Sequence, residues 1–227
     1  IEGILVSGDI SDDGSPASYQ RFKSIMASIG LPTYVIPGNH DNRENMREAF
    51  QSDKIFTKTG PLNWHKKIGN INIIGLDTLI EGKGEGYLGP KSLEYLKETL
   101  KNLHSQPTIL ALHHPPFETG IKFMDNIGLK NKDEFKDIIS NFNGELRVVC
   151  GHIHCMMVAS LNNHVVISSP SPSSNFEYDT RPNAPIGFMN GVDGFLLHRW
   201  NNGFQSIRVG PSAGAGPFPF RYMKNEL

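Results

Sequence analysis

The segment Val35-Ile36-Pro37-Gly38-Asn39-His40-Asp41 joins an apolar run to three polar, coordinating side chains. The run is β-branched and stops at Pro-Gly, a pattern that predicts a buried strand ended by a turn. An amide, an imidazole and a carboxylate then follow in a row, and burying them without partners is costly. The segment therefore indicates either a solvated turn, in which Asn and Asp are common, or a site that uses all three side chains.

Other apolar runs of the chain end in the same kind of side chain. The runs and the residues that follow them are 4–6 with Gly8-Asp9, 108–112 with His113-His114, and 146–149 with Gly151-His152-Ile153-His154. Further strands are predicted at 33–37 and 71–76, and helices at 16–29, 43–50, 90–103 and 132–142. Strands that alternate with helices predict an α/β fold. The carboxyl ends of such strands gather at one edge, where ligands bind.

The pattern changes beyond about residue 155. Strands are predicted at 164–168 and 194–200, and a third at 204–209 pairs back across the turn Asn201-Asn202-Gly203. Residues 168–193 are rich in Pro, Ser, Asn and Gly, and we expect a long excursion there. Residues 51–67 are predicted to be irregular, and 117–131 to form a long loop. We expect two sheets with helices outside, in one domain that spans residues 1–227.

Composition limits the classes of partner. The chain has 227 residues and a formal net charge of −1, so no global field attracts nucleic acid or an anionic membrane. No apolar run approaches the roughly 20 residues that span a bilayer. Cys150 and Cys155 form no disulfide framework, which favours a reducing, cytoplasmic setting. We therefore expect a small-molecule partner, no nucleic-acid polymer and no membrane.

The side chains at the strand ends form a set suited to a metal ion. The set comprises Asp9, Asn39, His40, Asp41, His113, His114, His152 and His154. Carboxylate, amide oxygen and imidazole suit Zn, Mn, Fe or Co. Each motif alone has an ordinary interpretation as a turn or a capped strand, but their joint occurrence at strand ends favours a metal site. Cys150 is interpreted as a small packing residue rather than a ligand.

Four blocks of this sequence resemble four of the five motif blocks of the calcineurin-like metallophosphoesterase superfamily. They are Gly8-Asp9, Gly38-Asn39-His40-Asp41, His113-His114-Pro115 and Gly151-His152-Ile153-His154. The residues around them resemble the bacterial class III cyclic-nucleotide phosphodiesterase and glycerophosphodiesterase branch. The resemblance implies a four-layer α/β-β/α sandwich of two mixed sheets, with two metal ions at its rim.

The same resemblance assigns the metal ligands residue by residue. It implies that Asp9 bridges the two ions, that Asn39, His113 and His152 complete one site, and that His154 belongs to the other. The implied metals are Mn, Fe or Zn. The family's first block, an Asp-x-His, should lie upstream, yet the eight residues before Asp9 contain no histidine.

We therefore expect the N-terminal strand and helix of the family to be missing from this sequence, either left out of it or truly lost. In the second case only one ion should bind well. The sheet edges exposed by a missing strand then need cover, for example from a partner chain in a homo-oligomer.

The resemblance also implies the reaction. His40 is expected beside the scissile phosphate and oriented by Asp41, as the catalytic pair, and His40 and His114 are candidate substrate contacts. The expected reaction is hydrolysis of phosphodiesters, either 3′,5′-cyclic nucleotides or glycerophosphodiesters, by a metal-bound hydroxide. The alternatives are a phosphomonoester or pyrophosphate hydrolase on the same dinuclear site, and a metal-poor, inactive binding protein. The excursion 168–193 is expected to be a cap, a subunit contact or a plain surface loop.

Overall fold

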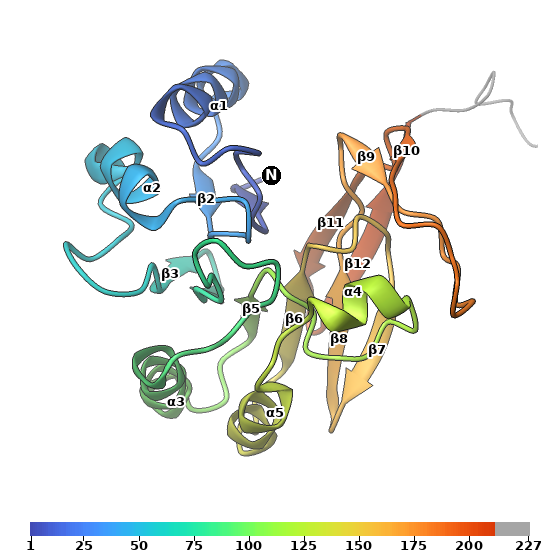
Figure 1. The fold of residues 1–227 in the computed structure, drawn as a ribbon. Coiled ribbons are helices and arrows are strands. Elements are labelled where there is room, and N and C mark those ends of the chain that lie inside the picture. Colours follow the sequence, from blue (N-terminus) through green and yellow to red (C-terminus); the bar gives the residue numbers. More distant parts are fainter. Residues whose placement is uncertain (212–227) are drawn as a thin grey trace, which may run out of the picture.

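The computed structural model describes residues 1–211, and a six-stranded mixed sheet lies at the centre of them (Figure 1). In spatial order its strands are β3 (Trp64–Ile68), β4 (Ile71–Gly75), β5 (Thr108–Ala111), β6 (Leu146–Cys150), β8 (His164–Ser168) and β7 (Val158–Leu161). The four inner strands are parallel, and β3 and β7 run antiparallel at the two edges. The carboxyl ends of β5 and β6 therefore lie at the same edge.

A second strand layer packs against one face of this sheet. It contains the parallel pair β1 (Ile4–Val6) and β2 (Thr33–Val35) and the hairpin of β11 (Phe195–Trp200) and β12 (Phe204–Val209). Side chains from both layers meet in one apolar cluster, which includes Ile36, Trp64, Ile109, Val149 and Phe204. The hairpin predicted from Asn201-Asn202-Gly203 is confirmed. A separate ribbon, β9 (Ser174–Asn175) with β10 (Met189–Asn190), lies in the excursion.

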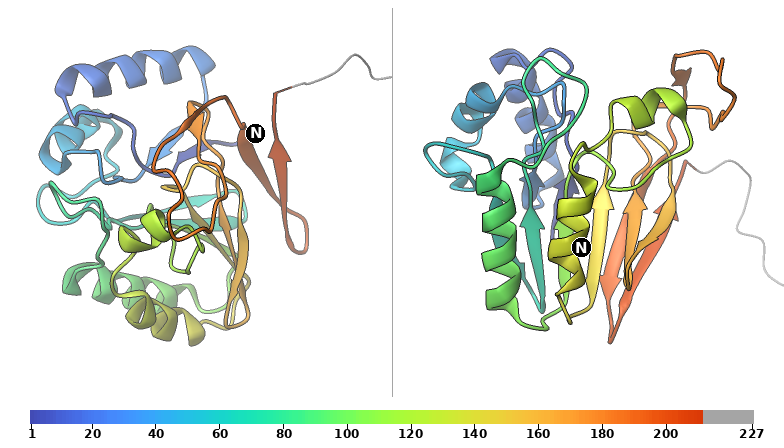
Figure 2. Two further views of the ribbon diagram at one scale, coloured as in Figure 1. Left: turned by 45° about the vertical axis from the view of Figure 1, so that its right-hand side comes forward. Right: turned by 60° about the horizontal axis from the view of Figure 1, so that its bottom comes forward.

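Helices cover the outer faces of the two strand layers. Helices α1 (Pro16–Ile29) and α2 (Arg43–Ala49) cover β1 and β2, and the short η1 (Gln51–Asp53) follows them. Helices α3 (Pro90–Leu103) and α5 (Lys132–Ser140) lie side by side over the far face of the central sheet (Figure 2). A short helix, α4 (Lys122–Asn126), lies beside the strand ends. Together these layers form the expected α/β-β/α sandwich. Only the central sheet is mixed, because the second layer consists of two separate two-stranded pairs, one parallel and one antiparallel.

Local signals explain where several elements begin and end. The Ser15 hydroxyl accepts a hydrogen bond from Ser18 N at 3.3 Å and caps α1, and Pro16 occupies its first turn. Gly30 ends the helix in a left-handed conformation with φ 71°. Strand β5 is buried on both faces, which explains its continuous apolar sequence. No helix within residues 1–211 combines the length and apolarity needed to cross a bilayer.

Six short elements were not predicted. The range 51–67, predicted as irregular, contains η1 and most of β3, and the predicted long loop at 117–131 contains α4. Strand β7 and the ribbon of β9 and β10 in the excursion were not recognised either. Some of these elements depend on neighbours from elsewhere in the chain. For example, Met124 makes α4 part of an apolar cluster with Ile121 and Ile153.

Candidate metal centre

The carboxyl ends of β1, β2, β5 and β6 meet at one rim, and each carries a residue of the predicted set. Asp9 and Asn39 follow β1 and β2 of the second layer, whereas His113 and His152 follow β5 and β6 of the central sheet. The amide oxygen of Asn39 lies 3.1 Å from Nε2 of His113 and 2.9 Å from Nδ1 of His152. Oδ2 of Asp9 lies 3.2 Å from Nε2 of His113. The structure thus brings four predicted donors into contact.

The tautomer of His113 shows what this cluster requires. Its Nδ1 lies 2.7 Å from the carbonyl oxygen of Ser7, a bond that only an N–H can donate. In a neutral imidazole, Nε2 then directs a lone pair toward the oxygens of Asp9 and Asn39. Lone pairs converging on one point repel unless a cation lies among them. A carboxylate, an amide oxygen and imidazoles are suitable ligands for a divalent cation.

The charges at this rim respond to one another. Burial is the largest single effect and lowers the pKa of His113, but the adjacent Asp9 carboxylate, the Ser7 carbonyl oxygen and Asp41 together outweigh it and leave that pKa raised. Burial raises the pKa of Asp9, and the opposing effect of His113 holds it below its ordinary value. The pair therefore favours a negative carboxylate next to a positive charge, which a proton or a metal ion supplies.

His152 carries a polar atom that is buried without a partner. The residue is 6% exposed, and its Nε2 has no hydrogen-bond partner within residues 1–211. Burial, and then the charge on His113, lower the pKa of His152 to about 3, so the imidazole is neutral and able to bind a cation. Buried polar atoms are rarely left unpaired, and an ion is one accepted explanation. The residues at this rim therefore fit a metal ion.

The backbone at the predicted ligands is strained. Asp9, His152 and His154 have φ of 52°, 67° and 50°, values that residues other than glycine seldom adopt. Such conformations persist only where the surrounding structure holds them, and they concentrate at functional sites. Close approach of the two ligand loops also requires glycine at position 38, where a Cβ would lie 2.1 Å from Oδ1 of Asp9.

Asp41 joins the two loops that carry Asp9 and Asn39. Its Oδ1 accepts hydrogen bonds from Ser11 N at 3.2 Å and from the Tyr19 hydroxyl at 3.0 Å. Its Oδ2 accepts from Ile10 N at 3.3 Å and from Gly38 N at 2.8 Å. Burial raises the pKa of this carboxyl group, and the residue is 5% exposed. Both carboxylate oxygens are therefore used in holding backbone and Tyr19.

His40 faces a different carboxylate from the one expected. Nδ1 of its ring lies 3.2 Å from the carbonyl oxygen of Asp12 and 3.4 Å from the Asp12 carboxylate. Its backbone N–H donates to Oδ1 of Asp9 at 3.0 Å. Within the described residues, the hydrogen bonds of Asp41 do not include the His40 ring. The expected orientation of His40 by Asp41 therefore has no contact to support it, and Asp12 is the neighbour in place.

His114 lies behind the rim rather than at its surface. It is fully buried, with Nε2 at 3.0 Å from the Gly84 carbonyl oxygen and Nδ1 at 2.8 Å from the Thr78 hydroxyl. Burial, followed by the charges of His113 and His152, lowers the pKa of His114 well below its ordinary value. Both ring nitrogens are engaged, so this geometry does not support the expected substrate contact.

His154 is half-buried and turns toward the excursion. Its Nδ1 lies 3.1 Å from the Ser174 hydroxyl, and its ring packs on Phe176. Asp12, Tyr19 and Ser174 were not identified from the sequence. Asp12 had a weak signal, because it follows Asp9 by three residues in the same loop. Ser174 had none, because only the return of the excursion brings it to the rim.

Comparison with known proteins places this geometry in a family. A model of the calcineurin-like phosphoesterases matches residues 2–156. The probable glycerophosphodiester phosphodiesterase GpdQ of Arcobacter nitrofigilis is 32% identical over 227 residues, which cover 99% of this chain and 83% of that protein. A 3′,5′-cyclic-nucleotide phosphodiesterase of a Nostoc species is 34% identical over 176 residues, covering 77% and 64% of the two chains.

Solved structures resemble the fold at low sequence identity. A dimetal phosphatase from Danio rerio superimposes with a TM-score of 0.58 at 14% identity, covering 75% of this chain and 72% of that one. The Plasmodium protein GAP50, described as an anchor in the inner membrane complex, gives a TM-score of 0.67 at 14% identity, covering 95% and 76%. These similarities bear on the fold alone, and they agree with the α/β architecture.

Proposed function

The chain belongs to the calcineurin-like phosphoesterase family, and from that premise we propose that it hydrolyses phosphodiesters at the rim described above. The observation that carries the proposal is the contact among Asp9, Asn39, His113 and His152, whose donor atoms converge from four strand ends. The relatives are named for glycerophosphodiesters and for 3′,5′-cyclic nucleotides, so these are the two candidate substrate classes.

Members of this family use divalent metal ions, and the donor atoms of Asp9, Asn39, His113 and His152 suit them. Asp9, Asn39, His113 and His152 would hold one ion, and His154 with Asp9 would contribute to a second. Such ions neutralise charge on phosphate oxygens and make a water molecule more acidic. Mn, Fe and Zn are all compatible with these ligands.

The protein's own side chains have separate tasks in this proposal. His40 is about half exposed, and its Nδ1–H donates to the Asp12 carbonyl group, which leaves Nε2 for the substrate. With a second proton on Nε2, the imidazolium can protonate the leaving oxygen or stabilise developing charge, a contribution of about 10²–10⁴-fold. Asp41 holds the two ligand loops in register. The phosphodiester is thus positioned by the rim and assisted by His40.

We extend the proposal to the setting of the protein. In this proposal residues 1–227 form one domain, and the excursion 168–193 contributes to the wall of the site. Both cysteines, Cys150 and Cys155, are free thiols, which supports a reducing, cytoplasmic setting. A homo-oligomer would be detected by measuring the mass in solution.

Substitution of His40 tests the function. We expect His40→Ala to lower kcat on bis(p-nitrophenyl) phosphate by about 10²–10⁴-fold, with the metal content unchanged. His104→Ala is the matched control, because His104 is an exposed histidine at the end of α3. Cyclic AMP and glycerophosphoethanolamine should then be compared as substrates. A metal-loaded protein that cleaves none of the three would refute the function, and equal rates for both variants would remove His40 from it.

A further inference from the structure

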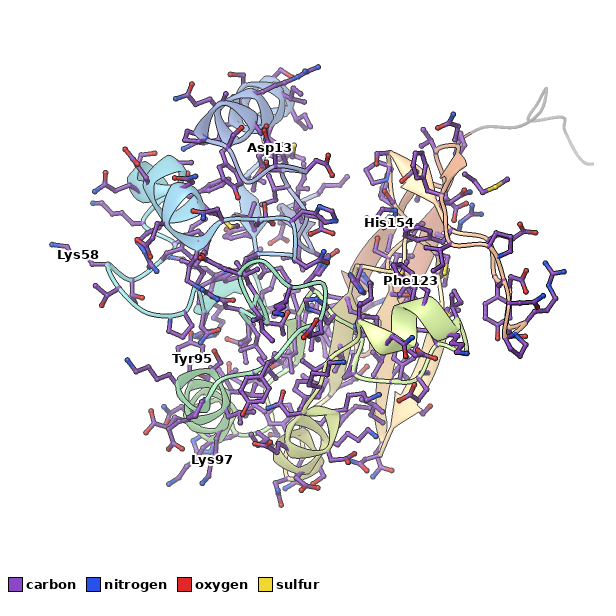
Figure 3. All side chains as sticks on the ribbon, in the orientation of Figure 1. Asp13, Lys58, Tyr95, Lys97, Phe123 and His154 are labelled. Carbon is purple, nitrogen blue, oxygen red and sulfur yellow. The ribbon has the colours of Figure 1, made fainter. Side chains whose placement is uncertain are left out.

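The excursion 168–193 returns to the metal rim through the ribbon of β9 and β10. Ser174 lies in β9, and its hydroxyl is 3.1 Å from Nδ1 of His154. The ring of Phe176 lies 4.7 Å from the His154 ring, centroid to centroid, at an interplanar angle of 33°. Figure 3 labels His154 on the side of the molecule that carries β9 and β10. One ring nitrogen and one face of His154 are therefore covered by the excursion.

The start of the excursion is hydrogen-bonded to the loop that carries His154. The Ser168 hydroxyl donates to the Cys155 carbonyl oxygen at 2.7 Å and accepts from Met157 N at 2.8 Å. Ser169 N donates to the Cys150 carbonyl oxygen at 2.7 Å. These bonds bracket the His154 loop on both sides. The loop and the excursion are therefore connected at their bases as well as through Ser174.

Phe176 is itself held in place. It packs against a buried apolar cluster that contains Ile121, Met124 and Ile153, contributed by the α4 region and by the His154 loop. A flat ring fixed by such a cluster restricts the rotation of the imidazole stacked on it. The cluster thus links α4, the excursion and the His154 loop.

His154 needs such support for two reasons. Its backbone is left-handed, with φ 50°, so its position depends on the surroundings. Its neutral ring has one N–H and one lone pair, and an Nδ1–H donated to Ser174 leaves the lone pair on Nε2. Outer partners of this kind fix the tautomer and orientation of metal-binding histidines, and their loss typically costs 10–100-fold in affinity.

We propose that Ser174 and Phe176 are positioning residues, which hold the His154 ring so that Nε2 is presented to a metal ion. This inference rests on the proposed function, because His154 is useful in this orientation only at a metal centre. It also gives the excursion a task that a plain surface loop would not have. Substitutions in the excursion that alter its contacts with substrate would then alter metal binding as well.

Nuclear magnetic resonance of the full, metal-free chain at pH 8 tests the tautomer directly. Histidine is labelled with ¹⁵N, and His154→Gln identifies the signal. We expect the Nδ1–H form in the wild-type protein, a mixture of tautomers in Ser174→Ala, and the wild-type form again in Ser174→Thr, which keeps the hydroxyl. Ser173→Ala is the matched control, because Ser173 is exposed one residue away.

Titration with Mn²⁺, followed through the signal of the free ion, measures the second consequence. We expect Ser174→Ala to weaken the less tightly bound Mn²⁺ by about 10-fold, and Phe176→Leu to weaken it by a smaller factor. Ser174→Thr should restore the affinity, which excludes a general folding defect. Tautomers and Mn²⁺ affinity in Ser174→Ala that match the wild-type values would overturn the proposal.

Turnover of the wild-type protein separates this inference from the function. If the metal-loaded chain cleaves no phosphodiester while Ser174→Ala still changes the tautomer and Mn²⁺ affinity, the positioning role stands and the function fails. If the chain cleaves phosphodiesters and Ser174→Ala changes neither property, the function stands and the positioning role fails.

Discussion

Replacement of Asp41 by asparagine should destabilise the protein and weaken metal binding together. The four hydrogen bonds to the Asp41 carboxylate include two backbone N–H groups on Oδ2, so an amide nitrogen cannot replace that oxygen. If the amide nitrogen of the asparagine takes the Oδ1 position, it faces the backbone N–H of Ser11, and this buried donor is left without an acceptor. An unpaired buried donor costs about 1–3 kcal/mol, and loss of the charge weakens the remaining bonds.

The expected total is about 3 kcal/mol, which corresponds to a fall in Tm of about 6–12 °C for a domain of this size. The matched control is Asp12→Asn, the same change in the same loop. The Asp12 side chain is fully exposed, so its loss should change stability by less than about 0.5 kcal/mol. Because Asp12 adjoins the His40 ring, this control should instead lower kcat by a factor of a few.

Thermal unfolding and metal content of both variants, measured beside kcat, decide between two roles for Asp41. If its main task is to hold the loops that carry Asp9 and Asn39, Asp41→Asn loses stability and metal affinity. If its task is to orient His40, the variant keeps its Tm and metal content and loses only kcat. That second outcome, with Asp12→Asn fully active, would refute the loop-holding role of Asp41.

Two further predictions concern pH and the excursion. Burial, and then Arg147, lower the pKa of His198 from 6.5 to about 4. The native protein therefore keeps its full stability above pH 6.5, where the ring is neutral in the folded and unfolded states. It loses stability as the pH falls toward 4, because the unfolded state then binds the proton more readily. Each tenfold change in proton affinity corresponds to about 1.4 kcal/mol. Between pH 7 and 4, the free energy of unfolding of His198→Asn in urea should therefore fall by up to about 3 kcal/mol less than that of the wild-type protein. Deletion of residues 177–188, which retains Ser174, should change the preference between cyclic AMP and a glycerophosphodiester by about tenfold, or 1.4 kcal/mol. An unchanged preference together with an unchanged mass in solution would identify a plain surface loop.

The strand-end residues could be predicted because their signal is local. An apolar run and a donor side chain follow one another within a few residues, with a glycine just before the donor at Asp9, Asn39 and His152, and the parallel strands of the two layers then bring the donors to one rim. The larger set of strand-end side chains was expected together on this basis. The resemblance to the family then singled out Asp9, Asn39, His113 and His152, which are in contact in the structure. The α/β fold followed from the same alternation of strands and helices.

The partners of those residues could not be predicted, because they come from distant segments or depend on side-chain direction. Asp41 was assigned to His40 by the resemblance to the family, yet its carboxylate bonds to Tyr19 and to the backbone of the neighbouring loops. Ser174 reaches His154 only through the fold of the excursion. The hairpin of β3 and β4 is different, since the turn Gly69-Asn70 between them was a readable signal that we missed.

The two halves of the metal rim belong to different strand layers, so their separation depends on the core between them. Asn39 follows β2, and His113 follows β5 of the central sheet. Trp64 is 3% exposed in the core between the layers, and its Nε1 donates to the Val35 carbonyl oxygen at 2.7 Å. This bond joins the central sheet to the strand that leads into Asn39. Because close-packed interiors transmit small displacements, the geometry of the donors is determined by apolar packing as much as by the donors themselves.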